Sequence, residues 1–225
     1  EAMGPILTAA AEAHTSIITP DKDDLTLLRG KRLENRIDYG GYRAALGLPG
    51  THQANHAAMA VEIALALWRE FGYDISDDAI LQGLADARMP ARIEVLRRHP
   101  LLLLDGCHNP DGAKMLAATL TRADFEENLV GVLGVLADKD YKDMLSDLGP
   151  CFAKVYTVTP NCPRALSAEE LQKEARFTPT PRPPTVWPMP SARPWTTRTR
   201  TTSRALLSAV RSTLQAKSVR ILSIK

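Results

Sequence analysis

Several polar side chains follow a run of four leucines near the middle of the chain. Leu101–Leu104 has the composition of a strand buried on both faces, as in a parallel sheet that helices cover. Asp105 comes where this strand ends, a tight turn with Gly and Pro follows, and a helical pattern begins at Asp111. Open α/β sheets bind ligands at the carboxyl ends of their strands, so Asp105, His108 and Asn109 are candidate site residues.

Each of these side chains has a chemical role available at such a position. Asp105 can accept a hydrogen bond from a ribose hydroxyl or hold a water molecule near magnesium, or it can cap the following helix. His108 can contact a transferring phosphoryl group or orient a carboxylate, or it can be a hydrogen-bonded structural residue. Cys107 is adjacent to His108, but neighbours in a tight turn do not easily face each other, so we do not expect a thiol nucleophile.

Three more residues can bind anions or a nucleobase. Arg92 follows a proline at a predicted hinge, where a guanidinium can hold a nucleotide phosphate or pair with Glu94 as a surface arginine. Lys139 lies between two aspartates after a buried strand and can meet a phosphate or a carboxylate, or it can belong to a solvated charge cluster. Asn55, in the first turn of a helix that Thr51 would cap, can bond an adenine edge or the nearby backbone.

A histidine pair invites comparison with a zinc site. His52 and His56 are four residues apart, which places them on one helix face, as in H-E-x-x-H sites. Gln53 stands where the general base would be, and no third ligand is evident. We therefore predict no metal site in this chain.

The elements that position these residues follow from hydrophobic spacing and from capping signals. We expect a helix within residues 1–20, followed over 21–50 by short strands or loops with a turn at Gly40–Gly41. A helix should then run from Thr51 to Phe71, where Gly72 ends it, and Ser76 should cap a further helix. Beyond Ile93, strands and helices alternate, which predicts a right-handed, mostly parallel sheet of Rossmann type. The predicted order is strand, strand (101–104), helix (111–122), strand (129–136), helix (142–148), strand (153–158), helix (167–175).

Composition limits the class of protein. The chain has 225 residues, 44% of them hydrophobic, which is enough for one or two cores. No apolar run reaches the roughly 20 residues that span a bilayer, and the first residues lack the layout of a signal peptide. Three cysteines without metal-ligand spacing favour a reducing compartment, so we predict a cytoplasmic protein without membrane or nucleic-acid partners.

Four segments, in the same order, resemble the motifs of one enzyme family. Asp105–Pro110 resembles D-G-A-H-N-P with cysteine for alanine, Leu48–Ala57 resembles G-x-H-Q-x-x-N-A, Pro90–Glu94 resembles P-G-R-x-E with alanine for glycine, and Gly134–Asp140 resembles G-x-x-x-D-K-D. Residues 1–175 are therefore similar to the folylpolyglutamate/dihydrofolate synthases, which are relatives of the Mur ligases.

This resemblance implies an activity and a set of site residues. It implies ATP-dependent ligation of L-glutamate to folate or dihydropteroate through an acyl phosphate, by an enzyme that is a monomer when complete. Asn55, Arg92 and Asp105 would contact ATP from a hinge and a C-terminal domain. His108 and Lys139 would be catalytic residues.

The chain has no phosphate-binding P-loop, since Gly30–Arg32 lacks both the first glycine and the hydroxyl residue of that motif. In the family this loop and the Mg²⁺ ligands lie in an upstream ATPase domain. We therefore expect an α/β fragment that is inactive alone. Residues 1–90 would be the helical C-terminal remnant of a P-loop-type ATPase domain together with the hinge, and residues 91–175 an incomplete, Rossmann-like C-terminal domain.

Residues 176–225 differ sharply in composition from the rest. Residues 1–175 carry all 26 acidic residues and 18 of the 28 basic ones, a net charge of −8, whereas residues 176–225 carry 10 basic residues and no acid, a net charge of +10. A shifted reading frame would remove acids from a whole segment, so we interpret this tail as out of frame. We expect a sheet without its last strands and disorder over 176–204.

Two alternatives remain open on the sequence. One is a fragment of a Mur-type peptidoglycan ligase, which shares the superfamily but fits the H-Q-x-x-N and D-G-C-H-N-P segments less well. The other is a non-catalytic Rossmann-like module whose basic tail binds nucleic acid or an anionic surface.

Overall fold

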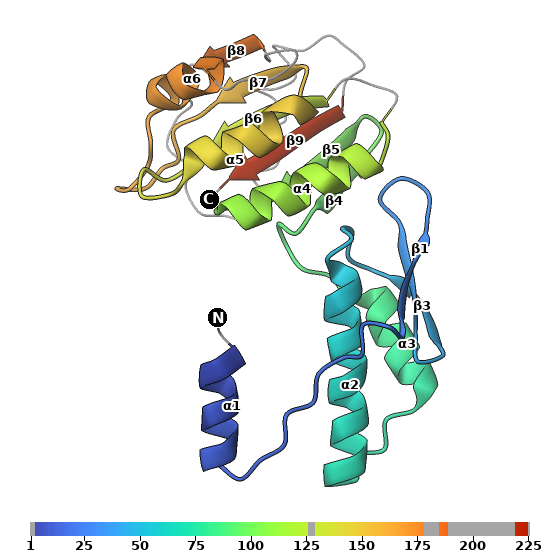
Figure 1. Ribbon diagram of the computed structural model, residues 1–225. Helices are drawn as coiled ribbons and strands as arrows, with labels where there is room; N and C mark the ends of the chain where they lie inside the picture. The colour runs from blue at the N-terminus through green and yellow to red at the C-terminus, as the bar shows by residue number, and fades with distance from the viewer. Residues whose placement is uncertain (1–2, 126–128, 178–184, 189–218, 225) are drawn as a thin grey trace. The chain divides into compact units, whose positions relative to one another are not determined.

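The computed structural model describes residues 3–125, 129–177, 185–188 and 219–224, which divide into two compact units (Figure 1). The first unit comprises residues 1–30, 34–47 and 51–88. The second comprises 31–33, 48–50 and 89–225.

The first unit packs two helices against a small antiparallel sheet. Its helices are α1 (Met3–Glu12), α2 (Gln53–Phe71) and α3 (Asp77–Asp86), and its strands, in the order β1-β2-β3, are β1 (Leu25–Arg29), β2 (Asn35–Tyr39) and β3 (Tyr42–Leu46). The core combines a few large residues of the sheet and α3 with small residues of α2. These are Ile37, Tyr39, Ala44, Ala54, Ala57, Ala58, Val61 and Ile80. Alanines on α2 let the helix approach the sheet closely.

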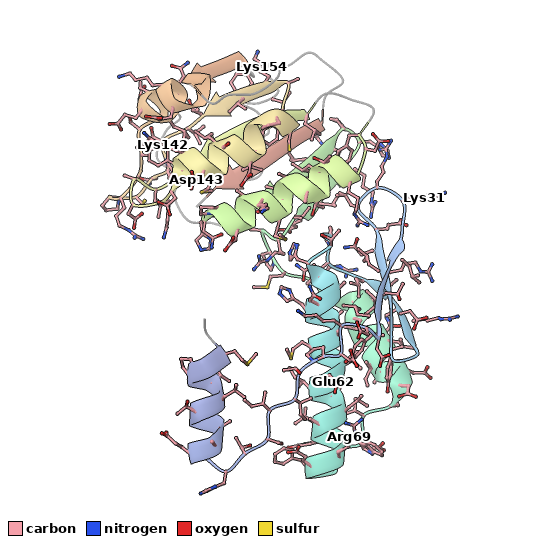
Figure 2. All side chains as sticks on the ribbon, in the orientation of Figure 1. Lys31, Glu62, Arg69, Lys142, Asp143 and Lys154 are labelled. Carbon is pink, nitrogen blue, oxygen red and sulfur yellow. The ribbon has the colours of Figure 1, made fainter. Side chains whose placement is uncertain are left out.

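Tyr39 joins the small sheet to α2. Its hydroxyl donates a hydrogen bond to Glu62, which is labelled on α2 in Figure 2, over 2.7 Å. The same oxygen accepts from the backbone N–H of Asp21 at 3.2 Å. Burial, followed by the bond to Glu62, raises the pKa of Tyr39 above its usual value.

Most local signals in this unit are confirmed. Gly40 and Gly41 form the β2–β3 turn with positive φ, Gly72 ends α2 in a left-handed conformation, and the Ser76 hydroxyl caps α3 by accepting from the backbone N–H of Ala79 at 3.2 Å. The predicted cap of α2 is wrong. His52, in a helical conformation and without a side-chain cap bond, precedes the helix in place of Thr51.

The second unit is built on a six-stranded sheet of order β4-β5-β9-β6-β7-β8. Among its described strand pairs, only β4–β5 is antiparallel, which confirms the predicted mostly parallel α/β fold. Its strands are β4 (Glu94–Arg98), β5 (Leu101–Asp105), β6 (Leu129–Gly134), β7 (Lys154–Thr157), β8 (Thr185–Pro188) and β9 (Val219–Ile224). Its helices are α4 (Pro110–Arg122), α5 (Tyr141–Leu148), the short 3₁₀ helix η1 (Gly149–Cys151) and α6 (Ala168–Phe177).

Helices α4, α5 and α6 lie along the same face of this sheet (Figure 1). All six residues of β6 are buried, as expected for a central parallel strand. The main core joins leucines of the sheet to the inner sides of the helices. Its members include Leu103, Leu116, Leu120, Leu133, Met144, Leu145, Leu148, Val155 and Leu171.

The capping box predicted at the start of α6 is confirmed. Ser167 Oγ donates to Glu170 Oε2 at 2.7 Å and accepts from the Glu170 backbone N–H at 3.2 Å. The bond from Ser167 Oγ, followed by one from the Ser167 backbone N–H to the same Oε2 at 3.3 Å, lowers the pKa of Glu170.

The expectation that the sheet lacks its last strands is wrong. β8 extends the sheet beyond β7, and β9 lies between β5 and β6, parallel to both (Figure 1). Val219–Ile224 is a short apolar, β-branched stretch, and the basic composition of the 50-residue tail obscured it. The predicted disorder of 176–204 falls mostly on 178–184 and 189–204, outside the described residues, and the frame error stays a prediction.

None of the helices in the described part of the chain combines the length and hydropathy that a bilayer-spanning helix needs.

Burial predicts an order of cysteine reactivity. Burial raises the pKa of the Cys151 thiol, whereas Cys162 is exposed. We expect N-ethylmaleimide at neutral pH to modify Cys162 before Cys151, as measured by mass spectrometry of peptides. The chain unfolded in urea should lose this order, and equal rates in the folded chain would contradict the burial of Cys151.

Candidate functional site

Arg92 lies at the centre of an unusual turn before β4. Ala91 and Ile93, on either side of it, have φ angles of 55° and 48°, a left-handed conformation that costs side-chain-bearing residues about 1–2 kcal/mol each. The Arg92 backbone N–H donates to the Met89 carbonyl at 3.3 Å. Its guanidinium is exposed and forms no ion pair with any described residue, so it is available to an anion.

Asp105 holds this turn against the end of β5. Its carboxylate is 5% exposed, and Oδ2 accepts from the Ile93 backbone N–H at 2.8 Å. Oδ1 accepts from the Cys107 N–H, also at 2.8 Å. Alongside, the Gly106 N–H donates to the Ala91 carbonyl at 2.7 Å. One buried carboxylate therefore fixes both the turn that carries Arg92 and the loop that leads to His108.

Asp105 does not cap α4, which was the structural alternative at this position. Asn109 is the cap, because its Oδ1 accepts from the Gly112 N–H at 2.8 Å. Asn109, one of the first candidates from sequence, is thus engaged by the helix that it starts. Its cap directs the chain from the β5 loop into α4.

His108 is exposed and its ring orientation is fixed at one nitrogen. Nδ1 lies 3.1 Å from the carbonyl oxygen of Gly106. A carbonyl oxygen only accepts, so we assign the proton to Nδ1, which leaves Nε2 as an acceptor in the neutral ring. The ring can therefore accept a proton or a hydrogen bond at Nε2, or donate there when it is charged.

A small open hollow brings His108 and Lys139 together at the carboxyl ends of β5 and β6. Its volume of about 190 Å³ includes the solvent space at its open mouth. The β5–α4 loop, the end of β6, the β6–α5 loop and one residue of α5 supply its lining. These residues are Cys107, His108, Gly134, Val135, Leu136, Lys139 and Met144. Lys139 is half-buried and forms no ion pair with any described residue. The hollow thus offers one cation and one imidazole to an anionic ligand.

The sequence analysis missed the residue that anchors the loop of Lys139. Arg164, in the β7–α6 loop, pairs with Asp138 at 2.7 Å and accepts the Ala137 N–H at its carbonyl oxygen over 2.8 Å. A bridge between Leu136 and Ala165 adds to this contact. Alternation of strands and helices could have suggested that these loops meet, because both follow neighbouring parallel strands.

Asn55 belongs to the first unit and lies exposed on the first turn of α2. Beside it, the buried side chain of Gln53 lies between the two histidines, with Nε2 3.0 Å from His52 and Oε1 3.0 Å from His56. Gln53 thus lies between the rings that a shared metal would have to join. Within the described residues, no group of three or more His, Cys, Asp or Glu side chains is placed to hold a metal ion.

The structure thus groups four of the five predicted residues in the second unit. Arg92 is joined to Asp105 through the backbone, and Asp105 to the loop of His108. His108 shares a hollow with Lys139, which Arg92 and Asp105 do not line.

The model of the family described as "Mur ligase, glutamate ligase domain" matches residues 91–220. The chain belongs to this family. In sequence, the match runs from the turn before β4 to the first residues of β9. Family membership therefore accounts for the mostly parallel sheet and for the loops at its carboxyl edge.

Individual relatives of the family are named for folate chemistry. The chain is 34% identical over 186 residues to a dihydrofolate synthase/folylpolyglutamate synthase of Mycobacterium tuberculosis, covering 79% of this chain and 38% of the relative. It is 38% identical over 120 residues to a folylpolyglutamate synthase of Lacticaseibacillus casei, covering 53% and 28%. The chain therefore spans about a third of the length of these curated relatives.

Solved structures of the family agree with the fold. A Mycobacterium tuberculosis folylpolyglutamate synthase complexed with ADP and AMPPCP superposes with a TM-score of 0.70 at 27% identity, over 98% of this chain and 49% of that one. The likeness covers both units of the present chain.

Removing the Asp105 carboxylate should destabilise the second unit. Asp105→Ala leaves the buried N–H of Ile93 and the partly buried N–H of Cys107 without their acceptor, so we expect a loss of about 2–3 kcal/mol in the free energy of unfolding, measured by urea denaturation. Asp111→Asn, at an exposed site in the first turn of α4, is the control and should change the value by less than about 0.5 kcal/mol. Equal effects would show that Asp105 holds nothing in place.

Glycine at position 91 should stabilise the chain. Ala91 has a left-handed φ, so Ala91→Gly removes strain and should raise the free energy of unfolding by up to about 1 kcal/mol. Ala118→Gly, at an exposed position of α4, should lower it by about 1 kcal/mol. Thermal denaturation of both variants measures the contrast, and a loss at position 91 would contradict the observed turn.

Proposed function

We propose that this chain supplies part of the nucleotide and glutamate sites of an ATP-dependent ligase that joins L-glutamate to folate or dihydropteroate. The names of its relatives support the substrate class, and the ADP and AMPPCP in a related structure support the nucleotide. The single observation that carries the proposal is the exposed, unpaired Arg92 on a turn fixed by buried Asp105.

Arg92 has the properties of a phosphate ligand. A guanidinium offers several donors in a fixed fork, and its gain on binding is largest when the backbone beneath it is already ordered. Hydrogen bonds to Ala91 and Ile93 provide that order on both sides. Arg92 would stabilise charge on the phosphoryl oxygens, which is the main protein contribution in phosphoryl transfer.

Asp105 and Asn55 would contribute differently to the nucleotide. Each carboxylate oxygen of Asp105 accepts one hydrogen bond from a backbone N–H. Because each oxygen has a second lone pair, a ribose hydroxyl can still donate to the carboxylate. Its main effect would be to fix the positions of the Arg92 turn and the His108 loop relative to each other. Asn55 would offer its exposed amide to the nucleotide from the first unit.

His108 and Lys139 would act on the amino-acid substrate and the reacting carboxylate. Lys139 presents a cation to the hollow, which suits a carboxylate or a phosphate. His108 presents Nε2, which can take up a proton from an attacking amine. Bound ATP supplies the phosphoryl group that turns the folate carboxylate into an acyl phosphate.

We assign no residue of this chain to Mg²⁺ and place its ligands in the upstream ATPase domain, as the family resemblance implies. We also propose that the complete enzyme, which includes that domain, is a cytoplasmic monomer.

Nucleotide titration tests the proposal directly. We expect ADP with Mg²⁺ to bind the full 225-residue chain in isothermal calorimetry, and Arg92→Ala to weaken binding ten-fold or more, equivalent to at least about 1.4 kcal/mol. Arg98→Ala, an exposed arginine of β4, is the matched control and should bind as the wild type does.

Two results would overturn this function. One is the absence of nucleotide binding, and the other is equal binding by Arg92→Ala and Arg98→Ala. Salt-sensitive DNA binding that depends on residues 176–225, without nucleotide binding, would favour the nucleic-acid module instead.

A further inference from the structure

A side chain that has no role in the proposed site, Glu94, also holds the turn around Arg92. The backbone N–H of Ala91 donates to Oε2 of Glu94 at 2.9 Å, so a side chain, rather than a backbone carbonyl, satisfies the first residue of the turn. Glu94 is the first residue of β4 and pairs across the sheet with Leu104. Its backbone is therefore fixed by the sheet while its carboxylate reaches back to the turn.

This bond opposes the conformational preference of the turn. Ala91 has a φ of 55°, and a residue with a Cβ returns to negative φ unless other contacts hold it. The Ala91 carbonyl is held by Gly106, and its N–H is held by Glu94. Without the bond to Glu94, the N–H of Ala91 is free and the backbone before Arg92 can change its conformation. The Arg92 side chain would then no longer leave the backbone in one fixed direction.

Glu94 does not act by neutralising Arg92. The sequence allowed an Arg92–Glu94 ion pair, but none forms among the described residues. Oε2 of Glu94 is used by the backbone of Ala91 instead. The arrangement therefore holds the turn and leaves the guanidinium open to an external anion.

We propose that Glu94 is a positioning residue, which orders the Arg92 turn for binding nucleotide phosphate. This inference rests on the proposed function for its consequence in binding. Its structural half, the ordering of the turn by the Glu94 carboxylate, is independent of any ligand.

Three substitutions at one position separate its possible roles. Glu94→Gln removes the charge but keeps an oxygen that accepts from Ala91, so it should preserve the turn. Glu94→Ala removes the acceptor, and Glu94→Asp shortens its reach. Glu174→Ala, which breaks the pair of Glu174 with Lys142 (labelled in Figure 2), is the control for loss of a surface carboxylate.

Backbone dynamics give the ligand-free readout. In ¹⁵N relaxation of the full chain, the Arg92 amide should have an order parameter of about 0.85 in the wild type and Glu94→Gln, and below about 0.6 in Glu94→Ala and Glu94→Asp. Order parameters in α4 should stay unchanged in every variant, which separates local loosening from unfolding. Unchanged values for Arg92 in Glu94→Ala would overturn the proposal.

A double-mutant cycle with ADP gives the binding readout. Glu94→Ala should weaken ADP binding about five-fold, Glu94→Gln and Glu174→Ala less than two-fold, and Glu94→Ala should add nothing once Arg92→Ala is present. Additive effects would overturn the positioning role, because Glu94 would then act without Arg92. If Arg92→Ala itself binds normally, the proposed function fails, and the order parameters alone decide the role of Glu94.

Discussion

The candidate site depends on one buried carboxylate that accepts two backbone N–H groups. Asp105 stands at the end of β5 with both oxygens engaged, one by the turn before β4 and one by the loop before α4. A charged acceptor at 5% exposure is tolerated because both bonds are charge-assisted and short. Two segments without regular secondary structure are thereby ordered by a single side chain at a strand end.

The sheet brings the second part of the site to the same edge. β5, β9 and β6 are parallel neighbours in that order, so the loops that follow β5 and β6 emerge at one edge of the sheet. The core beneath α4 and α5 fixes the starts of these helices, and with them His108 and Lys139. Contacts with the loop of Arg164 complete the support from the side of β7.

Two departures from the family motifs have different physical consequences. Alanine at position 91 occupies a left-handed conformation that glycine adopts at lower cost, and the surrounding hydrogen bonds hold it there. Cysteine at position 107 lines the hollow, and its backbone N–H makes the bond to Asp105 that any residue except proline would make. The first departure adds strain to the site, whereas the second changes only the lining of the hollow.

The sequence determined the features that depend on neighbours along the chain. Helix ends at Gly72, Ser76 and Ser167 follow from caps within a few residues, and the buried strand Leu101–Leu104 follows from its composition. Motif spacing also identified Arg92 as a candidate before any contact was known. Such signals are local because capping and periodicity are properties of one segment.

Tertiary structure decided which distant groups meet. It placed β9 in the centre of the sheet, although a tail without acidic residues predicted its absence. It gave Asp105 its two backbone partners, made Asn109 the cap of α4, and gave Glu94 the N–H of Ala91 in place of the Arg92 guanidinium. These choices depend on the path of the backbone, because a hydrogen bond needs its two groups within about 3 Å, whatever their separation in the sequence.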